Sequence, residues 1–426
     1  MEVWVLFGVF TLLLLIGTPV AFCLGIASLV TVLYIGLPPI VVFQQLNSGM
    51  NAFAMMAIPF FIYAGDLMMR GGIADRLIRL AAGFVGHLRG GLGQVNVVAS
   101  TLFGGISGSA VADASAIGGI MIPQMEKRGY AKDYSVNVTV SSAIIALMIP
   151  PSHNMIIYSI AAGGTISVAD LFTAGIVPGF LLAAALMITA YVVAVRRGYP
   201  ADPFPGFRTL AYFFVSAVPG ILLIFIIFGG VRSGVFTAAE SSCIAVVYAF
   251  LVTLFVYREL NWQGFVDATL GAVRTTAMVL LVIGTASAFG WLMAFLQVPQ
   301  ATIELMKAVS DNPIIVLLLI NVILLVLGTF MDMAPMIIIC TPIFLPVIKA
   351  FGIDPVHFGV ILILNAGIGL NTPPVGSVLF VGCAVGKISI GEAMKSIWPF
   401  LGASFLVLLL VTYIPGLSLW LPALFR

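Results

Sequence analysis

The sequence predicts an all-α polytopic membrane protein with two inverted-topology repeats, each containing a re-entrant helical hairpin and a proline-broken transmembrane helix. Composition is the first reason: of 426 residues, 62% are hydrophobic and 8% are charged, whereas soluble domains carry roughly 25% charged residues. The second reason is a proline pair in the middle of two apolar segments, at Pro150-Pro151 and Pro373-Pro374. The third is a nearly constant interval between matching residues in the two halves.

That interval is 222 to 225 positions over more than 100 residues. The matches are Pro123 with Pro346, Gly129 with Gly352, Gly105 with Gly328, Ile166-Ser167 with Ile388-Ser389, and Gly65, Leu67 and Met68 with Gly290, Leu292 and Met293. A duplicated membrane unit whose hydrophobic segments are broken by Pro or Gly at corresponding positions indicates the binding site of a secondary transporter. The repeat therefore predicts a transport protein.

Apolar runs long enough to cross a bilayer recur along the whole chain. We expect helical spans near residues 2–36, 53–69, 133–163, 168–195, 209–229, 236–256, 273–297, 355–385 and 396–424. Residues 2–36 form either one kinked helix or two short helices broken at Gly17-Thr18-Pro19. The amphipathic stretch Ile73–Leu80 predicts a helix along the membrane surface, and Gln300–Ser310 occupies the corresponding place in the second half.

Two further apolar segments are interrupted by small polar residues. Residues 90–126 contain Gly104–Ser109, and residues 312–350 contain Gly328–Asp332. Each segment is either two ordinary spans or a re-entrant hairpin. The Gly/Ser and Gly/Thr interruptions favour hairpins, because irregular backbone is costly against lipid and tolerated against a cavity.

Lys and Arg favour the cytoplasmic side of short loops. If both interrupted segments return the chain to its starting side, all but Arg232, Lys307, Lys349 and Arg426 of the 18 basic residues share one side. The first hairpin then enters from the cytoplasm and the second from the exterior, so the halves have opposite orientation. Charge does not separate hairpins from double spans, since both return the chain to the same side.

The chemistry is expected where helices are broken. Proline lacks an N–H group and its ring clashes with the carbonyl one turn back, so each break frees carbonyls in the middle of the membrane. Freed carbonyls and helix C-termini can coordinate a cation, and helix N-termini attract an anionic substrate group. The hairpin tips add Ser107, Ser109, Asp113, Thr329 and Asp332. Hard oxygen donors without neighbouring His or Cys suit Na⁺ better than a transition metal.

Other polar groups in apolar segments allow more than one interpretation. Asp66 and Glu240 lie near span ends, where each either reaches water or has a functional role. His153 and Asn154 follow the first proline pair, and either hydrogen-bond a polar substrate or cap a helix locally. The four cysteines have no metal-binding spacing and predict buried apolar side chains.

Several motifs together resemble the large membrane subunit of tripartite ATP-independent periplasmic (TRAP) transporters. They are Ala57-Ile58-Pro59-Phe60-Phe61, Gly86-His87-Leu88-Arg89-Gly90-Gly91, Leu102–Asp113, Ile149-Pro150-Pro151-Ser152, Leu171–Gly179 and Asn371-Thr372-Pro373-Pro374. The resemblance covers essentially the whole chain. It implies a multi-pass inner-membrane protein of a bacterium or archaeon in which a transport domain slides against a scaffold, an elevator mechanism.

The resemblance also implies a division of the chain. Residues 1–89 would supply scaffold helices and the surface arm of the first repeat, and 90–200 the first hairpin, its broken helix and the following helix. Residues 201–311 would supply scaffold helices and the second arm, and 312–426 the second hairpin, broken helix and last helix.

The site residues that the resemblance implies fall into three sets. A first Na⁺ site would use Ser107, Gly108, Ser109, Asp113, Pro150 and Ser152, and a second would use Gly328, Thr329, Asp332, Gly367, Asn371 and Thr372. Substrate would contact Ser152, His153, Asn154, Thr372, Pro373 and Gly376.

The family further implies two partners, a small four-helix membrane subunit and a periplasmic substrate-binding protein, and an organic acid as cargo. Ser152-His153-Asn154 departs from the more apolar continuation of dicarboxylate members and favours a hydroxylated acid such as a sialic acid. The alternative is a standalone sodium-coupled dicarboxylate carrier of related architecture. Enzymes are disfavoured, because neither two zinc-spaced histidines on a helix nor a Gly-X-Gly-Asp aspartate occurs.

Overall fold

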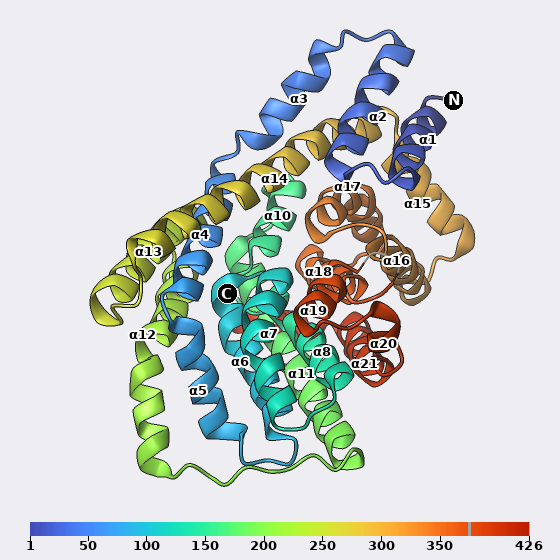
Figure 1. Ribbon diagram of the computed structural model, residues 1–426. Helices are drawn as coiled ribbons and strands as arrows, with labels where there is room; N and C mark the ends of the chain where they lie inside the picture. Colours follow the sequence, from blue (N-terminus) through green and yellow to red (C-terminus); the bar gives the residue numbers. More distant parts are fainter. Residues whose placement is uncertain (374–375, 426) are drawn as a thin grey trace.

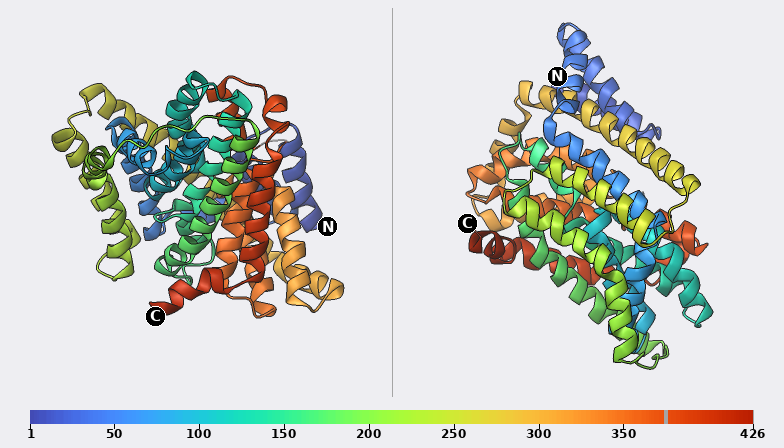
Figure 2. Two further views of the ribbon diagram at one scale, coloured as in Figure 1. Left: turned by 90° about the horizontal axis from the view of Figure 1, so that it is seen from below. Right: turned by 90° about the vertical axis from the view of Figure 1, so that its left-hand side faces the viewer.

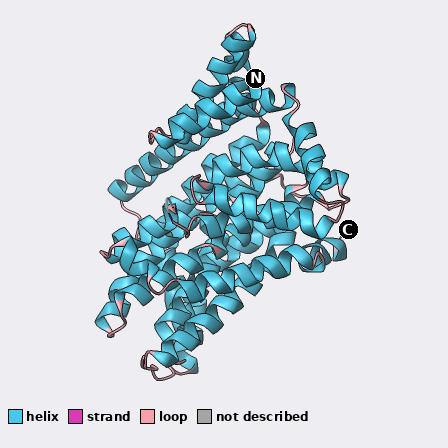
Figure 3. Cartoon of the chain, turned by 90° about the vertical axis from the view of Figure 1, so that its right-hand side faces the viewer, coloured by secondary structure: helices cyan, strands magenta, loops and turns pink. Residues whose placement is uncertain are grey.

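Helices make up almost all of the regular structure. The computed structural model describes residues 1–373 and 376–425, and within these ranges the chain forms no β-strand, only an isolated bridge between Arg89 and Ala201 (Figure 3). In the described part, six helices are long and apolar enough to cross a membrane, or up to eight when each of two bent helix pairs counts as one span. The prediction of an all-α fold is confirmed.

The N-terminal region consists of short helices. Residues 2–36 form two helices, α1 (Glu2–Leu15) and α2 (Val20–Ile35), because Gly17 has a φ of +88° and Pro19 precedes the first turn of α2. A further helix, α3 (Ile40–Met50), was not predicted and lies against α14. A 3₁₀ turn at Phe53–Met56 leads into α4 (Ala57–Arg70), and α5 (Ile73–Val85) follows.

Four more helices follow, of which the first three lie along one side of the molecule and the last lies at its opposite edge (Figures 1 and 2). They are α12 (Phe207–Arg232), α13 (Ala238–Leu251, extended by a π turn at Val252–Val256), α14 (Trp262–Phe295) and α15 (Val298–Val309). The prediction of a helix start near residue 273 was wrong for α14. Asn261 caps this helix by accepting a hydrogen bond from the Gly264 N–H (2.7 Å), so α14 begins earlier, before its strongly apolar part.

The remaining helices form a bundle beside this group. The first half contributes α6 (Gly91–Ser107), α7 (Ala110–Lys127), α8 (Lys132–Ala143), α9 (Ile145–Met148), α10 (His153–Ala161) and α11 (Val168–Arg196). The second contributes α16 (Pro313–Gly328), α17 (Met333–Ala350), α18 (Pro355–Gly369), α19 (Ser377–Gly386), α20 (Ile390–Met394), α21 (Trp398–Tyr413) and α22 (Gly416–Leu424).

The helices are interrupted at the positions that the sequence marks. The α6–α7 pair breaks at Gly108-Ser109, and α16–α17 at Thr329–Asp332. Residues Ile149–Ser152 separate α9 from α10, and the chain bends by 51° there. The last span, residues 396–424, was expected to be continuous, but α21 and α22 meet at 59° around Pro415. Pro374, in the second predicted break, lies outside the described residues.

In each half, the helix that leads into the hairpin tip (α6 or α16, here called the hairpin arm) touches the backbone of the broken helix. A Cβ added to Gly104 of α6 would lie 2.5 Å from Cα of Ala146 in α9. A Cβ added to Gly369 of α18 would lie 2.7 Å from Cα of Gly328, the last residue of α16. Both contacts therefore require a residue without a side chain, and both lie next to a tip and a break.

Buried polar side chains link the same helix pairs further from the breaks. Asn96 of α6 donates to the Thr139 hydroxyl (2.6 Å) and accepts from the Ser142 hydroxyl (3.1 Å) on α8. In the second half, Asn365 of α18 donates to Oδ1 of Asn321 in α16 (2.8 Å). All of these side chains are fully or almost fully buried. They fix the alignment of each hairpin arm along its broken helix, because a buried amide without a partner is costly.

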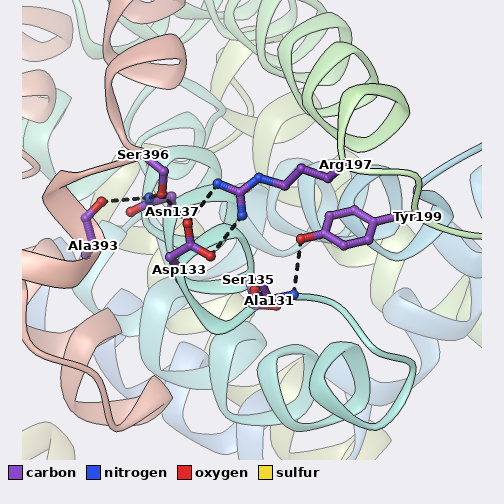
Figure 4. A network of polar contacts seen from close by, with 8 residues as sticks. All are labelled: Ala131, Asp133, Ser135, Asn137, Arg197, Tyr199, Ala393 and Ser396. Carbon is purple, nitrogen blue, oxygen red and sulfur yellow. Dashed lines mark hydrogen bonds and ion pairs between the residues drawn. The ribbon is translucent and has the colours of Figure 1, made fainter.

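The halves are joined crosswise. Helix α10 packs on α17, and α19 packs on α7, so each segment after a break contacts the hairpin of the other half. At one end, Asp133 of α8 receives two hydrogen bonds from Arg197 (2.9 and 2.8 Å) and one from the Ser396 hydroxyl (2.6 Å) (Figure 4). Asn137 donates to the Ala393 carbonyl (2.9 Å), which ties α8 to the short helix α20 of the second half.

Replacing Gly104 by Ala is expected to lower the melting temperature of the purified protein, because the new methyl group meets the backbone of α9 and overpacking costs about 1–3 kcal/mol. The matched control is Gly119→Ala on the exposed face of α7, where a Cβ meets nothing within 4 Å. There, helix propensity favours Ala by about 1 kcal/mol. Equal melting temperatures for the two variants would contradict the requirement for a bare backbone at Gly104.

Candidate functional site

The tip of the first hairpin lies against the first helix break. Gly108, between α6 and α7, has a φ of +58°, and a Cβ there would lie 2.8 Å from the Pro151 carbonyl oxygen and 3.2 Å from Cα of Ser152. The Gly108 carbonyl accepts a hydrogen bond from the Asn154 side chain (3.3 Å). The structure therefore brings together the tip, Ser107–Ser109, and the break, Pro150–Ser152, that the sequence assigned to one site.

Several oxygens near this junction are buried without a hydrogen-bond partner among the described residues. Asp113, one turn into α7, is completely buried beside the hydroxyl of Ser100, and neither of its carboxylate oxygens accepts a hydrogen bond. The Ser152 hydroxyl at the break is likewise buried and unpartnered. Buried polar groups are normally satisfied, so each such oxygen requires an explanation. A bound cation would satisfy them.

The donor set favours an alkali cation. No three side chains of His, Cys, Asp or Glu come together anywhere in the described residues. The available groups are hydroxyls, backbone carbonyls, amide oxygens and a single carboxylate, which are hard oxygen donors. These residues fit Na⁺ as a transported ion, and the assignment of individual ligands remains a prediction.

The second junction is built differently. Gly328 at the end of α16 contacts Gly369 at the end of α18, so the second tip also meets its break. Thr329 and Thr372 donate their hydroxyl protons to carbonyls of their own helices, at Val326 (2.8 Å) and Ile368 (2.9 Å). Gly367 is packed against Ile144 and Leu147 of the first broken helix rather than against the tip.

Asn371 and Gly376 shape the segment around the second break. The Asn371 side chain is buried and donates to the Val140 carbonyl of α8 (2.7 Å), while its oxygen has no partner among the described residues. Gly376 turns tightly over the end of α18, since a Cβ there would lie 2.7 Å from the Leu370 carbonyl oxygen. Among the described second-half residues with a buried unpartnered oxygen, which also include Asn365 and Ser418, Asn371 is the one that lies two residues before the second proline pair.

The two tip aspartates are not equivalent. Asp113 is fully buried, whereas Asp332 is exposed and precedes α17, where its Oδ1 accepts a hydrogen bond from the Ser377 hydroxyl (3.3 Å). Ser377 begins α19, so Asp332 connects the second tip to the helix that follows the second break. A buried unpaired carboxylate demands a cation far more strongly than an exposed one.

The predicted substrate residues separate as well. The Asn154 amide is committed to the Gly108 carbonyl and holds the first tip, which favours its structural role. His153 instead lines a cavity of about 100 Å³ together with Ser107 and Ser109. Asp66 of α4 and Thr275 of α14 line the same cavity from the other side. Thr275 was not predicted, because a threonine within a long apolar helix carries no mark of function, and Asp66 lines a cavity between helices.

The fold is shared with solved membrane transporters. The structure of the YdaH transporter of Alcanivorax borkumensis matches with a TM-score of 0.62 at 13% sequence identity, covering 89% of this chain and 87% of that chain. At this identity the likeness concerns the fold alone. The two chains share an α-helical architecture over most of their length.

Sequence comparison identifies the family. The family model described as "Tripartite ATP-independent periplasmic transporter, DctM component" matches residues 7–417. The chain therefore belongs to the DctM family, the large permease components of TRAP transporters, as the motifs predicted.

Relatives match over nearly their full length. A Salmonella typhimurium protein, uncharacterized protein YgiK, is 49% identical, with 99% of this chain and 97% of the relative covered. The sialic acid TRAP transporter large permease protein SiaM of Vibrio cholerae is 39% identical (97% and 96% covered). The C4-dicarboxylate TRAP transporter large permease protein DctM of Rhodobacter capsulatus is 37% identical (100% and 99% covered). The chain is a multi-pass inner-membrane permease and not an enzyme.

Replacing Asp113 by Asn is expected to raise the Na⁺ concentration needed for half-maximal transport by about tenfold or more, because it removes the one buried charge that a cation would neutralise. Ser109→Ala and Asp332→Ala should have smaller effects in the same direction. The first removes a neutral hydroxyl, and the second removes a carboxylate that is exposed. The measurement is Na⁺-dependent uptake at matched membrane levels of each variant. A wild-type sodium response in all three variants would refute the assignment of the hairpin tips.

Proposed function

We propose that this permease takes up an organic acid together with Na⁺ across the inner membrane, using cargo delivered by a periplasmic binding protein. The observation that carries the proposal is the group of buried, unpartnered oxygens of Asp113, Ser152 and Asn371 beside the two helix breaks. Such oxygens are satisfied by cations, and the breaks add freed carbonyls of the preceding helices.

The same breaks supply a place for an anion. Helices α10 and α19 begin at His153 and Ser377, directly after the two breaks, and their first N–H groups have no partner within the helix. A helix N-terminus favours negative charge, whereas the ends of α9 and α18 favour positive charge. An organic carboxylate and Na⁺ would therefore bind side by side, which couples their movement.

The cargo is proposed to be a sialic or other sugar acid or a C4-dicarboxylate, in line with the named activities of SiaM and DctM. The sequence argument for a hydroxylated acid used three polar residues, Ser152, His153 and Asn154. The Asn154 amide is engaged with Gly108, so Ser152 and His153 remain to contact hydroxyl groups.

The two-body movement expected of an elevator is supported by the packing. The hairpins and broken helices form one bundle held by crosswise contacts between the halves. Helices α4 and α14 lie beside this bundle and share cavities with it. We propose that the bundle is the transport domain, that α4 and α14 belong to the scaffold, and that the two repeats are inverted.

Uptake by the reconstituted complete transporter should require an inward Na⁺ gradient, because the proposed site needs a cation before the anion is stable beside the buried carboxylate. The measurement is uptake of labelled N-acetylneuraminate and succinate into liposomes with external Na⁺ or K⁺. Uptake that continues without Na⁺, or that follows ATP, would overturn sodium coupling.

The permease alone should show negligible uptake. DctM-family permeases work with a small membrane subunit and a periplasmic binding protein, and this chain has few cationic groups to attract an anion from dilute solution. Activity is expected only when both partners are supplied, the binding protein in its loaded form. Robust Na⁺-driven uptake by the permease alone would favour the alternative, a standalone sodium-coupled carrier.

A further inference from the structure

A cavity between α4, α14 and the first hairpin tip contains a carboxylate to which no role has been assigned. It has a volume of about 100 Å³ and is lined by Asp66 and Thr275 on one side and by Ser107, Ser109 and His153 on the other. A water molecule occupies about 30 Å³ in the liquid, so the cavity has room for a few waters. Asp66 is the one charged side chain among the described residues that line it.

The carboxylate of Asp66 is positioned but forms no ion pair within the described residues. A Cβ on Gly271 would lie 2.9 Å from Oδ2 of Asp66, so the carboxylate rests against bare backbone of α14. Arg70, one turn along α4, forms its ion pair with Asp267 (3.6 Å) and acts on Asp66 only as a neighbouring positive charge. Within the described residues, Asp66 accepts no hydrogen bond. A negative charge is thus held in the cavity wall.

This cavity adjoins the proposed first Na⁺ site. Gly65, next to Asp66, approaches the hairpin tip closely, since a Cβ on Gly65 would lie 3.6 Å from Cα of Ser107. Ser107 and Ser109 belong both to the proposed ion site and to the cavity wall. An ion that leaves the tip on this side therefore enters a small polar space beside a carboxylate.

The second half has no equivalent charge. Gly65 and Leu67 correspond to Gly290 and Leu292, so the counterpart of Asp66 is Trp291, which stacks on Phe295 (5.3 Å between ring centroids). A cavity of about 340 Å³ lies beside Gly290, between α3, α14, α10 and α17, and none of its lining residues in the described chain is charged. A charge needed only to hold the fold together would be expected in both halves.

We infer that the cavity is a transit site for Na⁺, in which the Asp66 carboxylate receives the ion released from the first hairpin tip. The inference rests on the proposed function, including the orientation in which the Arg70 end of α4 lies on the cytoplasmic side. The carboxylate lowers the energy of a hydrated cation on its way to the cytoplasm. It also repels the organic acid, which favours release of the anion away from this wall.

The test uses the complete transporter in liposomes, with N-acetylneuraminate or succinate as cargo, whichever the wild type takes up. Internal Na⁺ inhibits uptake by rebinding from the cytoplasmic side. Asp66→Asn should raise the internal Na⁺ concentration for half-inhibition by about five- to tenfold, the effect of removing one nearby unit charge at an intermediate dielectric. The external Na⁺ concentration that gives half-maximal uptake should change by less than about twofold, because Na⁺ that binds from outside does not pass through this cavity.

Three further variants complete the design. Asp66→Glu keeps the charge and should behave nearly as wild type, whereas Thr275→Val removes a neutral oxygen from the same wall of the cavity and should give a smaller shift in the same direction. Asp75→Asn is the matched control, because it removes an exposed carboxylate of α5 that lies outside the cavity and leaves the ion pair between Arg70 and Asp267 intact. If Asp66→Asn does not reach the membrane, Thr275→Val and Asp66→Glu still decide the outcome.

The outcomes separate this inference from the proposed function. A wild-type protein that ignores Na⁺ on both sides overturns the proposed function and with it the transit site. A sodium-coupled wild type whose Asp66→Asn and Thr275→Val variants respond normally to internal Na⁺ overturns the transit site alone. Equal shifts on both sides would also overturn it, because they would show that Asp66 acts on the ion site as a whole.

Discussion

The close approach of a hairpin arm to a broken helix is the constraint on which the rest of the bundle depends. Gly104 meets Ala146, and Gly328 meets Gly369, at distances that exclude even a methyl group. Each contact lies directly before a hairpin tip on one helix and a break on the other. It therefore places the tip and the break side by side. Without it, freed carbonyls, helix ends and tip hydroxyls would be separated by side chains. The polar site exists because two helices can touch through backbone.

Polar pairs then hold that arrangement in one alignment. Asn96 with Thr139 and Ser142, and Asn321 with Asn365, lie further along the same helices in both halves. A shift of one helical turn would bury these groups without partners, which costs about 1–3 kcal/mol for each. Apolar packing alone would not resist such a shift, because lipid-facing helices gain little from contacting each other rather than lipid. Crosswise packing of α10 on α17 and α19 on α7 makes the two halves one body.

Local chemistry made much of this architecture predictable. Gly17 and Pro19 predicted the gap between α1 and α2, and the interruptions at 104–109 and 328–332 predicted where α6 and α16 end, although α6 continues through Gly104 and Gly105 as far as Ser107. Helix α3 was missed because its 11 residues include Gln44, Gln45 and Asn47, and its place depends on packing against α14. The difference between buried Asp113 and exposed Asp332 was also beyond the sequence, because both follow a tip and only tertiary packing decides which is covered. For Asn154 the sequence left a substrate contact or a local helix cap open, and the hydrogen bond to Gly108 is neither, because the tip that it braces lies 46 residues away in the chain.

Similar geometry with different chemistry is what makes a duplicated transporter directional. Both halves have a tip against a break, but the buried carboxylate, Asp113, belongs to the first, and in the second the aspartate is exposed and bonded to Ser377. Helices α4 and α14 show the same kind of difference, with Asp66 in one half and Trp291 at the matching position of the other. In the proposed elevator movement, similar backbones would allow the bundle to be stable in two positions, since the same contacts could form on either side. Unequal charges would then give the proposed ion different surroundings in those two positions, and that difference would set the order in which ion and anion are bound and released.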